Sequence, residues 1–284
     1  MDRRIITLLL LLAAAAWGWW DALVVMANRW ERDPQYSHGY LVPVFACALL
    51  WLRRNKLTWK AESGSWWGIG LLAVAFGLRV AGARFYMEWL DAISLLPCLA
   101  GICLVAFGWR VFAWALPVIV FLLFMIPLPF RIEQAIQYPL RQVGTIGGVY
   151  AMQTVGLPAV ARGNVIMVGD VQLGVAEACS GLSMLMVFMA LTWAAAIISD
   201  RPLWERAIIV LSGVPIAIAA NVARISVTGV LFAMNQSDLA NRVFHDFAGW
   251  LMMPFAFALL CCELWLLSRL FIHEERTQVK LGLR

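Results

Sequence analysis

Charged residues are scarce in this chain. Asp, Glu, Lys and Arg together make up 14% of its 284 residues, whereas hydrophobic residues make up 63% and the mean hydropathy is +0.80. Soluble domains carry about 25% charged residues, so the composition excludes that class and indicates a polytopic membrane protein. About eight spans use most of the chain, and we therefore expect a single transmembrane domain over residues 1–284 with no separate soluble domain.

The sequence also lacks metal-ligand and disulfide patterns. It has three histidines, and five of its six cysteines lie inside apolar runs without zinc or disulfide spacing. These five are Cys47, Cys98, Cys103, Cys261 and Cys262, and they are typical of small core residues. The excess of basic residues, 22 against 17 acidic ones, suits cytoplasmic loops and requires no nucleic acid. We expect no nucleic-acid partner, and the thiol chemistry that is described below requires no metal ion and no organic cofactor.

Long apolar runs predict where the chain crosses the membrane. We expect eight crossings, at about 5–27, 40–52, 66–81, 89–107, 111–128, 181–198, 207–234 and 247–272. The loop from Arg53 to Ser65 has the densest basic cluster of the chain, so we place it in the cytoplasm. With the amino terminus inside, the C-terminal tail is also cytoplasmic.

Two features separate the fifth and sixth spans. Between Phe130 and Leu157, apolar residues recur at helical spacing, which predicts an amphipathic helix at the membrane interface. Polar residues fill the other side of this helix: Arg131, Glu133, Gln134, Gln137, Arg141 and Gln142. Two strand-like runs, 164–168 and 171–175, are joined by a Gly-Asp turn typical of β-hairpins. The predicted fold is therefore an all-α polytopic protein of about eight transmembrane helices, with an interfacial amphipathic helix and a short β-hairpin.

Cys179 lies where the predicted hairpin leads into the sixth span. From Gly181 to Ile198 there is no charged side chain, so Cys179 falls in the first turn of a transmembrane helix, near the membrane surface. A free thiol has a pKa near 8.5 and is only about 3% ionised at pH 7, so a nucleophilic cysteine needs positive potential. The N-terminus of the helix supplies part of that potential.

Two further residues could complete a site with this thiol. Arg224 lies inside an apolar stretch of 28 residues (207–234), where burying a guanidinium costs on the order of 3 kcal/mol. His245 lies between the last two spans and can act as acid and base near neutral pH. Two crossings separate Cys179 from Arg224 and His245, so all three share one membrane face in either orientation.

Each of the three residues also has a structural explanation. Cys179 could serve helix packing beside small residues, and Arg224 could reach the interface from a tilted helix. His245 could be a solvated helix cap, and Asp246 is poorly placed to orient it because neighbouring side chains on a helix point apart. The coincidence of the three on one face favours catalysis. Three further candidates fall on that face: Tyr36, Ser37 and His38.

Four segments of the chain resemble the exosortase family, the membrane-embedded cysteine transpeptidases of exported proteins with a C-terminal Pro-Glu-Pro sorting signal. The segments are 33–43, 178–182, 221–225 and 244–246, in the family's order. The resemblance implies Cys179 as nucleophile, with Arg224 and His245 completing the site. Four residues are candidate substrate contacts: Tyr36, Ser37, His38 and Asn221. The archaeal sister group carries arginine where His245 stands, so the histidine indicates the bacterial branch.

The predicted activity is cleavage of the sorting signal through a thioester on Cys179, followed by transfer to an unknown acceptor outside the cytoplasm. The expected partners are exported proteins with a sorting signal and a transmembrane tail, together with membrane lipids. We expect a multi-pass protein of the bacterial inner membrane whose site faces the periplasm. Two alternatives stay open: a transporter or lipid-binding protein in which Arg224 contacts an anionic substrate, and a membrane cysteine protease that uses water as acceptor.

Overall fold

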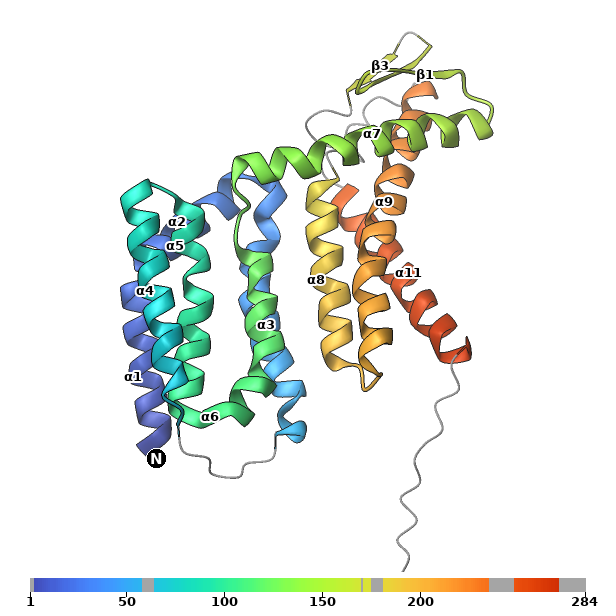
Figure 1. Ribbon diagram of the computed structural model, residues 1–284. Coiled ribbons are helices and arrows are strands. Elements are labelled where there is room, and N and C mark those ends of the chain that lie inside the picture. Colours follow the sequence, from blue (N-terminus) through green and yellow to red (C-terminus); the bar gives the residue numbers. More distant parts are fainter. Residues whose placement is uncertain (1–2, 58–63, 170, 175–180, 235–247, 271–284) are drawn as a thin grey trace, which may run out of the picture.

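A computed structural model describes residues 3–57, 64–169, 171–174, 181–234 and 248–270, and most of them are helical (Figure 1). The first half of the chain forms α1 (Arg3–Gly18), α2 (Trp20–Arg32), η1 (Pro34–Tyr40), α3 (Leu41–Leu52), η2 (Arg54–Lys56), α4 (Trp67–Phe85), α5 (Glu88–Ile93), α6 (Leu95–Phe121) and η3 (Leu122–Met125). The second half forms α7 (Phe130–Thr154), β1 (Ala159–Arg162), β2 (Val165–Val168), β3 (Val171–Gly174), α8 (Leu182–Ile198), α9 (Leu203–Ala233) and α11 (Ala248–Leu270).

The helices form two groups that α7 connects. In Figure 1, α1 to α6 lie together, α8, α9 and α11 form a second group beside them, and α7 lies across the same end of both. The largest apolar core contains residues of α2, α3 and α6 together with Ala190 and Ile197 of α8, so the two groups share one core. Trp193 of α8 also donates a hydrogen bond of 3.1 Å from Nε1 to the Pro117 carbonyl of α6.

Three of the described helical segments are long and apolar enough to cross a membrane. They are Trp67–Phe85, Glu88–Met125 and Leu203–Ala233, and the bent pair of α1 and α2 makes a fourth if it is one span. The predicted number of about eight is not confirmed. A straight helix of the 38 residues in Glu88–Met125 would measure about 57 Å, nearly twice the hydrocarbon core of a bilayer. Non-helical backbone at Gly108 (φ 78°, ψ −172°) breaks this segment between the predicted fourth and fifth spans, and Figure 1 shows that α6 is strongly bent.

The first predicted span is not one continuous helix. The structure bends the chain by 66° between α1 and α2, at Trp19, whose φ and ψ are −103° and 17°. Trp19 Nε1 donates a hydrogen bond of 2.7 Å to the buried Ser94 Oγ, 75 residues away. The hydropathy of 5–27 does not reveal the bend, because its anchor belongs to another part of the chain.

The structure confirms a helix between the fifth and sixth predicted spans, α7, but its burial does not follow the predicted division into an apolar and a polar side. Glu133 and Gln137, two of the six residues assigned to its polar side, are buried. Two of its apolar residues, Ile132 and Ile146, are 43% and 67% exposed. Glu133 and Gln137 form hydrogen bonds inside the protein, whereas Arg131, Gln134 and Gln142 are exposed.

The structure also confirms the hairpin. β2 and β3 pair antiparallel with Val168 opposite Val171, and Gly169 in the turn has a φ of 58°. The third strand, β1, was not predicted and pairs antiparallel with β2. Ile166 of β2 is completely buried in a cluster with Met152 of α7 and Ile225 of α9, so the sheet is anchored on both helices.

Candidate active site

Arg224 lies on a buried side of α9. It is 8% exposed, and its Nη2 donates a hydrogen bond of 2.9 Å to Oδ1 of the buried Asn221, one turn earlier. The Nε of Arg224 is buried and has no partner among the described residues. A neutral amide does not cancel the charge of a guanidinium. Arg224 can therefore stabilise an anion that approaches this side of α9.

Asn221 lies where α7, α9 and the start of α8 meet. A Cβ atom at Gly144 of α7 would lie 3.0 Å from Asn221 Nδ2, and one at Gly147 would lie 2.7 Å from Val222 Cγ2. Glycines at these positions let the two helices approach closely. Gly181, which precedes α8, has a left-handed φ of 72°, and a Cβ atom there would lie 3.1 Å from Asn221 Nδ2. One buried amide is therefore in contact range of all three elements.

The other two predicted catalytic residues, Cys179 and His245, lie outside the described residues. In the sequence, Cys179 is only two residues before Gly181, so chain connectivity ties it to this junction. His245 is three residues before Ala248, where α11 begins. The roles of the two remain predictions.

The structure does not bring the predicted substrate contacts of the N-terminal segment to Arg224. Tyr36 is 1% exposed. Its hydroxyl group donates a hydrogen bond of 3.4 Å to Glu133 Oε2 and accepts one of 3.2 Å from the Leu128 amide. His38 is also buried, and its Nε2 lies 3.1 Å from the Phe124 carbonyl oxygen. Ser37 is exposed and donates to the Pro34 carbonyl of its own turn.

Burial keeps both rings uncharged. It lowers the pKa of His38 below the ordinary value of 6.5, so the ring is neutral at pH 7 and donates from Nε2 to the Phe124 carbonyl. Burial, reinforced by the negative charge of Glu133, raises the pKa of Tyr36 to about 12. Neither group is therefore poised to exchange a proton at neutral pH, and both hold segments together instead.

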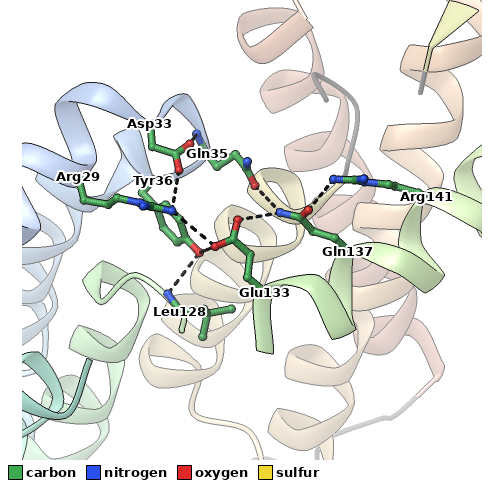
Figure 2. A network of polar contacts seen from close by, with 8 residues as sticks. All are labelled: Arg29, Asp33, Gln35, Tyr36, Leu128, Glu133, Gln137 and Arg141. Carbon is green, nitrogen blue, oxygen red and sulfur yellow. Dashed lines mark hydrogen bonds and ion pairs between the residues drawn. The ribbon is translucent and has the colours of Figure 1, made fainter. Parts of the chain in front are cut away.

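A polar network that the sequence interpretation missed joins this N-terminal segment to α7 (Figure 2). Besides Tyr36, Glu133 contacts Arg29 at 3.6 Å and accepts a hydrogen bond of 2.9 Å from Gln137 Nε2. Gln137 Nε2 also donates to Gln35 Oε1 at 2.9 Å, and Arg141 Nη2 donates to Gln137 Oε1 at 2.6 Å. A cavity of about 740 Å³ adjoins Arg29 and Glu133.

The network has a signal in the sequence. Glu133, Gln137 and Arg141 recur every four residues, which places them on one side of a helix. Their partners, Arg29, Gln35 and Tyr36, leave no such signal, because they lie about a hundred positions earlier.

The N-terminal contacts and the Asn221 contact lie at different positions along α7. Tyr36 contacts Glu133, whereas Asn221 contacts Gly144, and these helix positions are 11 residues or about 16 Å apart. Gln137 and Arg141 occupy the interval between them.

Within the described residues, no group of three or more His, Cys, Asp or Glu side chains could hold a metal ion.

Comparison with known proteins identifies the family. No curated protein and no solved structure matches the chain. A family model described as transmembrane exosortase matches residues 30–262, which is more than half of the chain and includes all four segments that carry the resemblance. The chain therefore belongs to the transmembrane exosortase family.

Proposed function

We propose that this protein is a membrane-embedded cysteine transpeptidase with Cys179 as nucleophile, Arg224 as oxyanion ligand and His245 as acid and base. Members of the exosortase family are generally cysteine transpeptidases that act on exported proteins with sorting signals. The observation that carries the proposal is the junction at Asn221. It holds the buried Arg224 through a hydrogen bond and contacts Gly181, two residues after Cys179.

The reaction would begin when the Cys179 thiolate attacks the carbonyl carbon of the scissile amide. The negative charge that develops on the carbonyl oxygen would be stabilised by the Arg224 guanidinium, which offers a planar set of donors. The carbon–nitrogen bond then breaks, the amine leaves with a proton from His245, and a thioester remains on Cys179. The acceptor nucleophile attacks the thioester, gives its proton to His245 and regenerates the thiolate.

The substrates in this proposal are exported proteins with a Pro-Glu-Pro sorting signal and a transmembrane tail. The chain acts as one transmembrane domain of the bacterial inner membrane, and the junction at Asn221 faces the periplasm. A tail that lies in the bilayer would deliver the signal at the depth of helix ends, where α7, α8 and α9 meet.

Substitution of the nucleophile tests the proposal. We expect Cys179→Ala to remain inserted in the membrane and to lose processing of a co-expressed substrate with a Pro-Glu-Pro signal, because alanine cannot form a thioester. Cys47→Ala is the matched control, since Cys47 is an exposed cysteine on α3. Gel mobility of the substrate at equal enzyme levels measures the difference. Normal processing by Cys179→Ala would overturn the proposal.

The mass of the product separates transfer from hydrolysis. Transfer to an acceptor leaves an added group on the new C-terminus, whereas hydrolysis leaves a free carboxylate. Mass spectrometry of the processed substrate reads this difference directly. If every product molecule has a free carboxylate, the protein is a cysteine protease and not a transpeptidase, although the thiol chemistry on Cys179 is the same.

A further inference from the structure

Arg141 is a basic residue beside the Asn221 junction whose charge no described carboxylate neutralises. Its Nη2 donates to a neutral amide, Gln137 Oε1, at 2.6 Å, and its Nε is buried without a partner among the described residues. Four other basic residues of the described chain do pair with carboxylates: Arg29, Lys56, Arg79 and Arg201. A partly buried guanidinium without a counter-charge is costly, so an anionic ligand is its expected use.

The orientation of Arg141 is determined by the network in Figure 2. Gln137 Nε2 lies 2.9 Å from both Gln35 Oε1 and Glu133 Oε1, and each of these oxygens requires a donor. The amide of Gln137 can therefore be oriented in only one way, with its own oxygen toward Arg141. Glu133 is held in turn by Tyr36. The guanidinium is thus pre-oriented before any ligand arrives.

Arg141 is also close to the proposed active site along α7. A Cβ atom added at Gly181 would lie 3.8 Å from the Cβ of Leu140, the residue before Arg141. Gly144, three residues after Arg141, contacts Asn221. Three residues on a helix advance about 300°, so Arg141 points within about 60° of the direction of Gly144. Arg141 is three residues from Gly144 and Arg224 is three residues from Asn221, so each arginine position is about one turn from this contact between α7 and α9.

We infer that Arg141 is a specificity-determining residue, which binds a carboxylate of the peptide substrate beside the scissile bond. The inference rests on the proposed function, because the peptide is the ligand that must lie next to Gly181 while Cys179 reacts. A planar fork with one edge held by Gln137 suits a carboxylate, which it can bind with two parallel hydrogen bonds. In this inference Gln137 positions the guanidinium of Arg141, and three residues position Gln137: Gln35, Tyr36 and Glu133.

A pair of substrates tests the inference. The purified full-length enzyme in phosphatidylcholine vesicles is given an exported protein with a Pro-Glu-Pro signal or its Pro-Gln-Pro counterpart. We expect wild type to have a KM about 10- to 100-fold lower for the acidic substrate, the size of a hydrogen-bonded charge contact. Arg141→Gln should remove this preference by raising the KM for the acidic substrate alone. Arg131→Gln, at an exposed arginine on the same helix, is the matched control and should keep it.

A charge-reversal variant distinguishes loss of the carboxylate contact from misfolding. Arg141→Glu should process a Pro-Lys-Pro substrate better than the Pro-Glu-Pro one, which a damaged fold would not do. Equal loss on both substrates in Arg141→Gln, or no acid preference in wild type, would overturn the inference and leave the proposed function standing. No processing of any substrate by wild type would overturn both. If processing by wild type requires added anionic lipid but does not depend on the glutamate of the substrate, Arg141 binds a lipid phosphate and the inference is overturned.

Discussion

Arg29 and Arg224 show how differently this protein uses two arginines. The Arg29 side chain is 48% exposed and lies 3.2 Å from Asp33 and 3.6 Å from Glu133, so acidic neighbours neutralise its charge. The Arg29–Asp33 pair is partly exposed on both sides, and such a pair contributes about 0–1 kcal/mol to stability. Arg224 is buried and donates a hydrogen bond to the neutral side chain of Asn221. Among the described residues no carboxylate pairs with Arg224, which is the condition that its proposed role as oxyanion ligand requires.

The kind of positive charge at Arg224 is testable. Lysine would keep one charge but lose the planar fork, and its pKa falls on burial. If the fork binds an oxyanion, we expect Arg224→Lys to lose about 100- to 1,000-fold in processing rate, the usual effect of removing one oxyanion donor. The measurement is substrate turnover at matched enzyme levels. Arg131→Lys, on the exposed surface of α7, should process normally. Near-normal turnover by Arg224→Lys would show that charge alone matters there.

The buried ring of His38 makes stability depend on pH. Its pKa is lowered in the folded protein, so below pH 6.5 the unfolded chain binds a proton more readily than the folded one. The contribution to stability is therefore complete above pH 6.5 and is lost as the pH falls through the folded-state pKa. Glutamine could still donate to the Phe124 carbonyl without titrating. We expect the unfolding midpoint of His38→Gln to fall less than that of wild type between about pH 7 and 5. Identical pH profiles in detergent would contradict this role.

At the scale of elements, the contact between α7 and α9 depends on small residues. A Cβ atom at Gly148 would lie 2.7 Å from Ile225 Cγ2, and this methyl group cannot move aside easily because it is attached to a branched Cβ. Overpacking of this kind costs about 1–3 kcal/mol, while alanine in a helix gains about 1 kcal/mol over glycine. We therefore expect Gly148→Ala to lower the thermal unfolding midpoint and to slow processing, because α7 would move away from Asn221.

A glycine elsewhere in the chain separates packing from helix propensity. Gly77 lies inside α4 with nothing within 4 Å of its Cβ position. Gly77→Ala should leave the midpoint unchanged or raise it slightly, because it gains propensity without a clash. The two variants are compared in the same detergent. Equal behaviour of Gly148→Ala and Gly77→Ala would show that the approach of α7 to α9 is not limited by side-chain volume.

The helices and strands themselves were largely predictable from the sequence, but the side of each that is buried was not. Apolar residues at helical spacing predicted the helix that became α7, and the Gly-Asp turn predicted the hairpin of β2 and β3. Both signals are local, because they depend on backbone geometry within a few residues. The side of α7 that turns inward depends on Arg29, Gln35 and Tyr36, which supply partners for Glu133 and Gln137. No periodicity within α7 contains that information.

At the scale of the whole molecule, two sets of contacts mark opposite ends. At one end Lys56 forms an ion pair with Asp200, and Arg53 Nη1 donates to the Trp114 carbonyl at 2.8 Å. At the other end Tyr36 contacts Glu133 at the start of α7. These three contacts join segments that were predicted to share a membrane face, whereas the predicted outer segment 235–246 lies outside the described residues. The number of crossings is not confirmed.

Labelling of single cysteines tests which end faces outward. In a background without native cysteines, Arg162→Cys on β1 and Asn55→Cys in η2 are both at exposed positions at opposite predicted faces. We expect a membrane-impermeant thiol reagent to label Arg162→Cys in intact cells and to label Asn55→Cys only after the cells are opened. The reverse pattern would place the junction at Asn221 in the cytoplasm and exclude a periplasmic acceptor.

The sequence by itself determined that this protein is a helical membrane protein of the exosortase family. Hydropathy, helical spacing and short motifs are local properties, and a composition with 63% hydrophobic residues leaves few other folds. Only the tertiary structure decided that Tyr36 contacts Glu133, that α1 and α2 bend at Trp19, and that Asn221 meets Gly144 and Gly181. Each of these contacts joins residues about 40 to 100 positions apart in the sequence. Whether such a residue is buried depends on how the helices pack, because packing brings its partner to it.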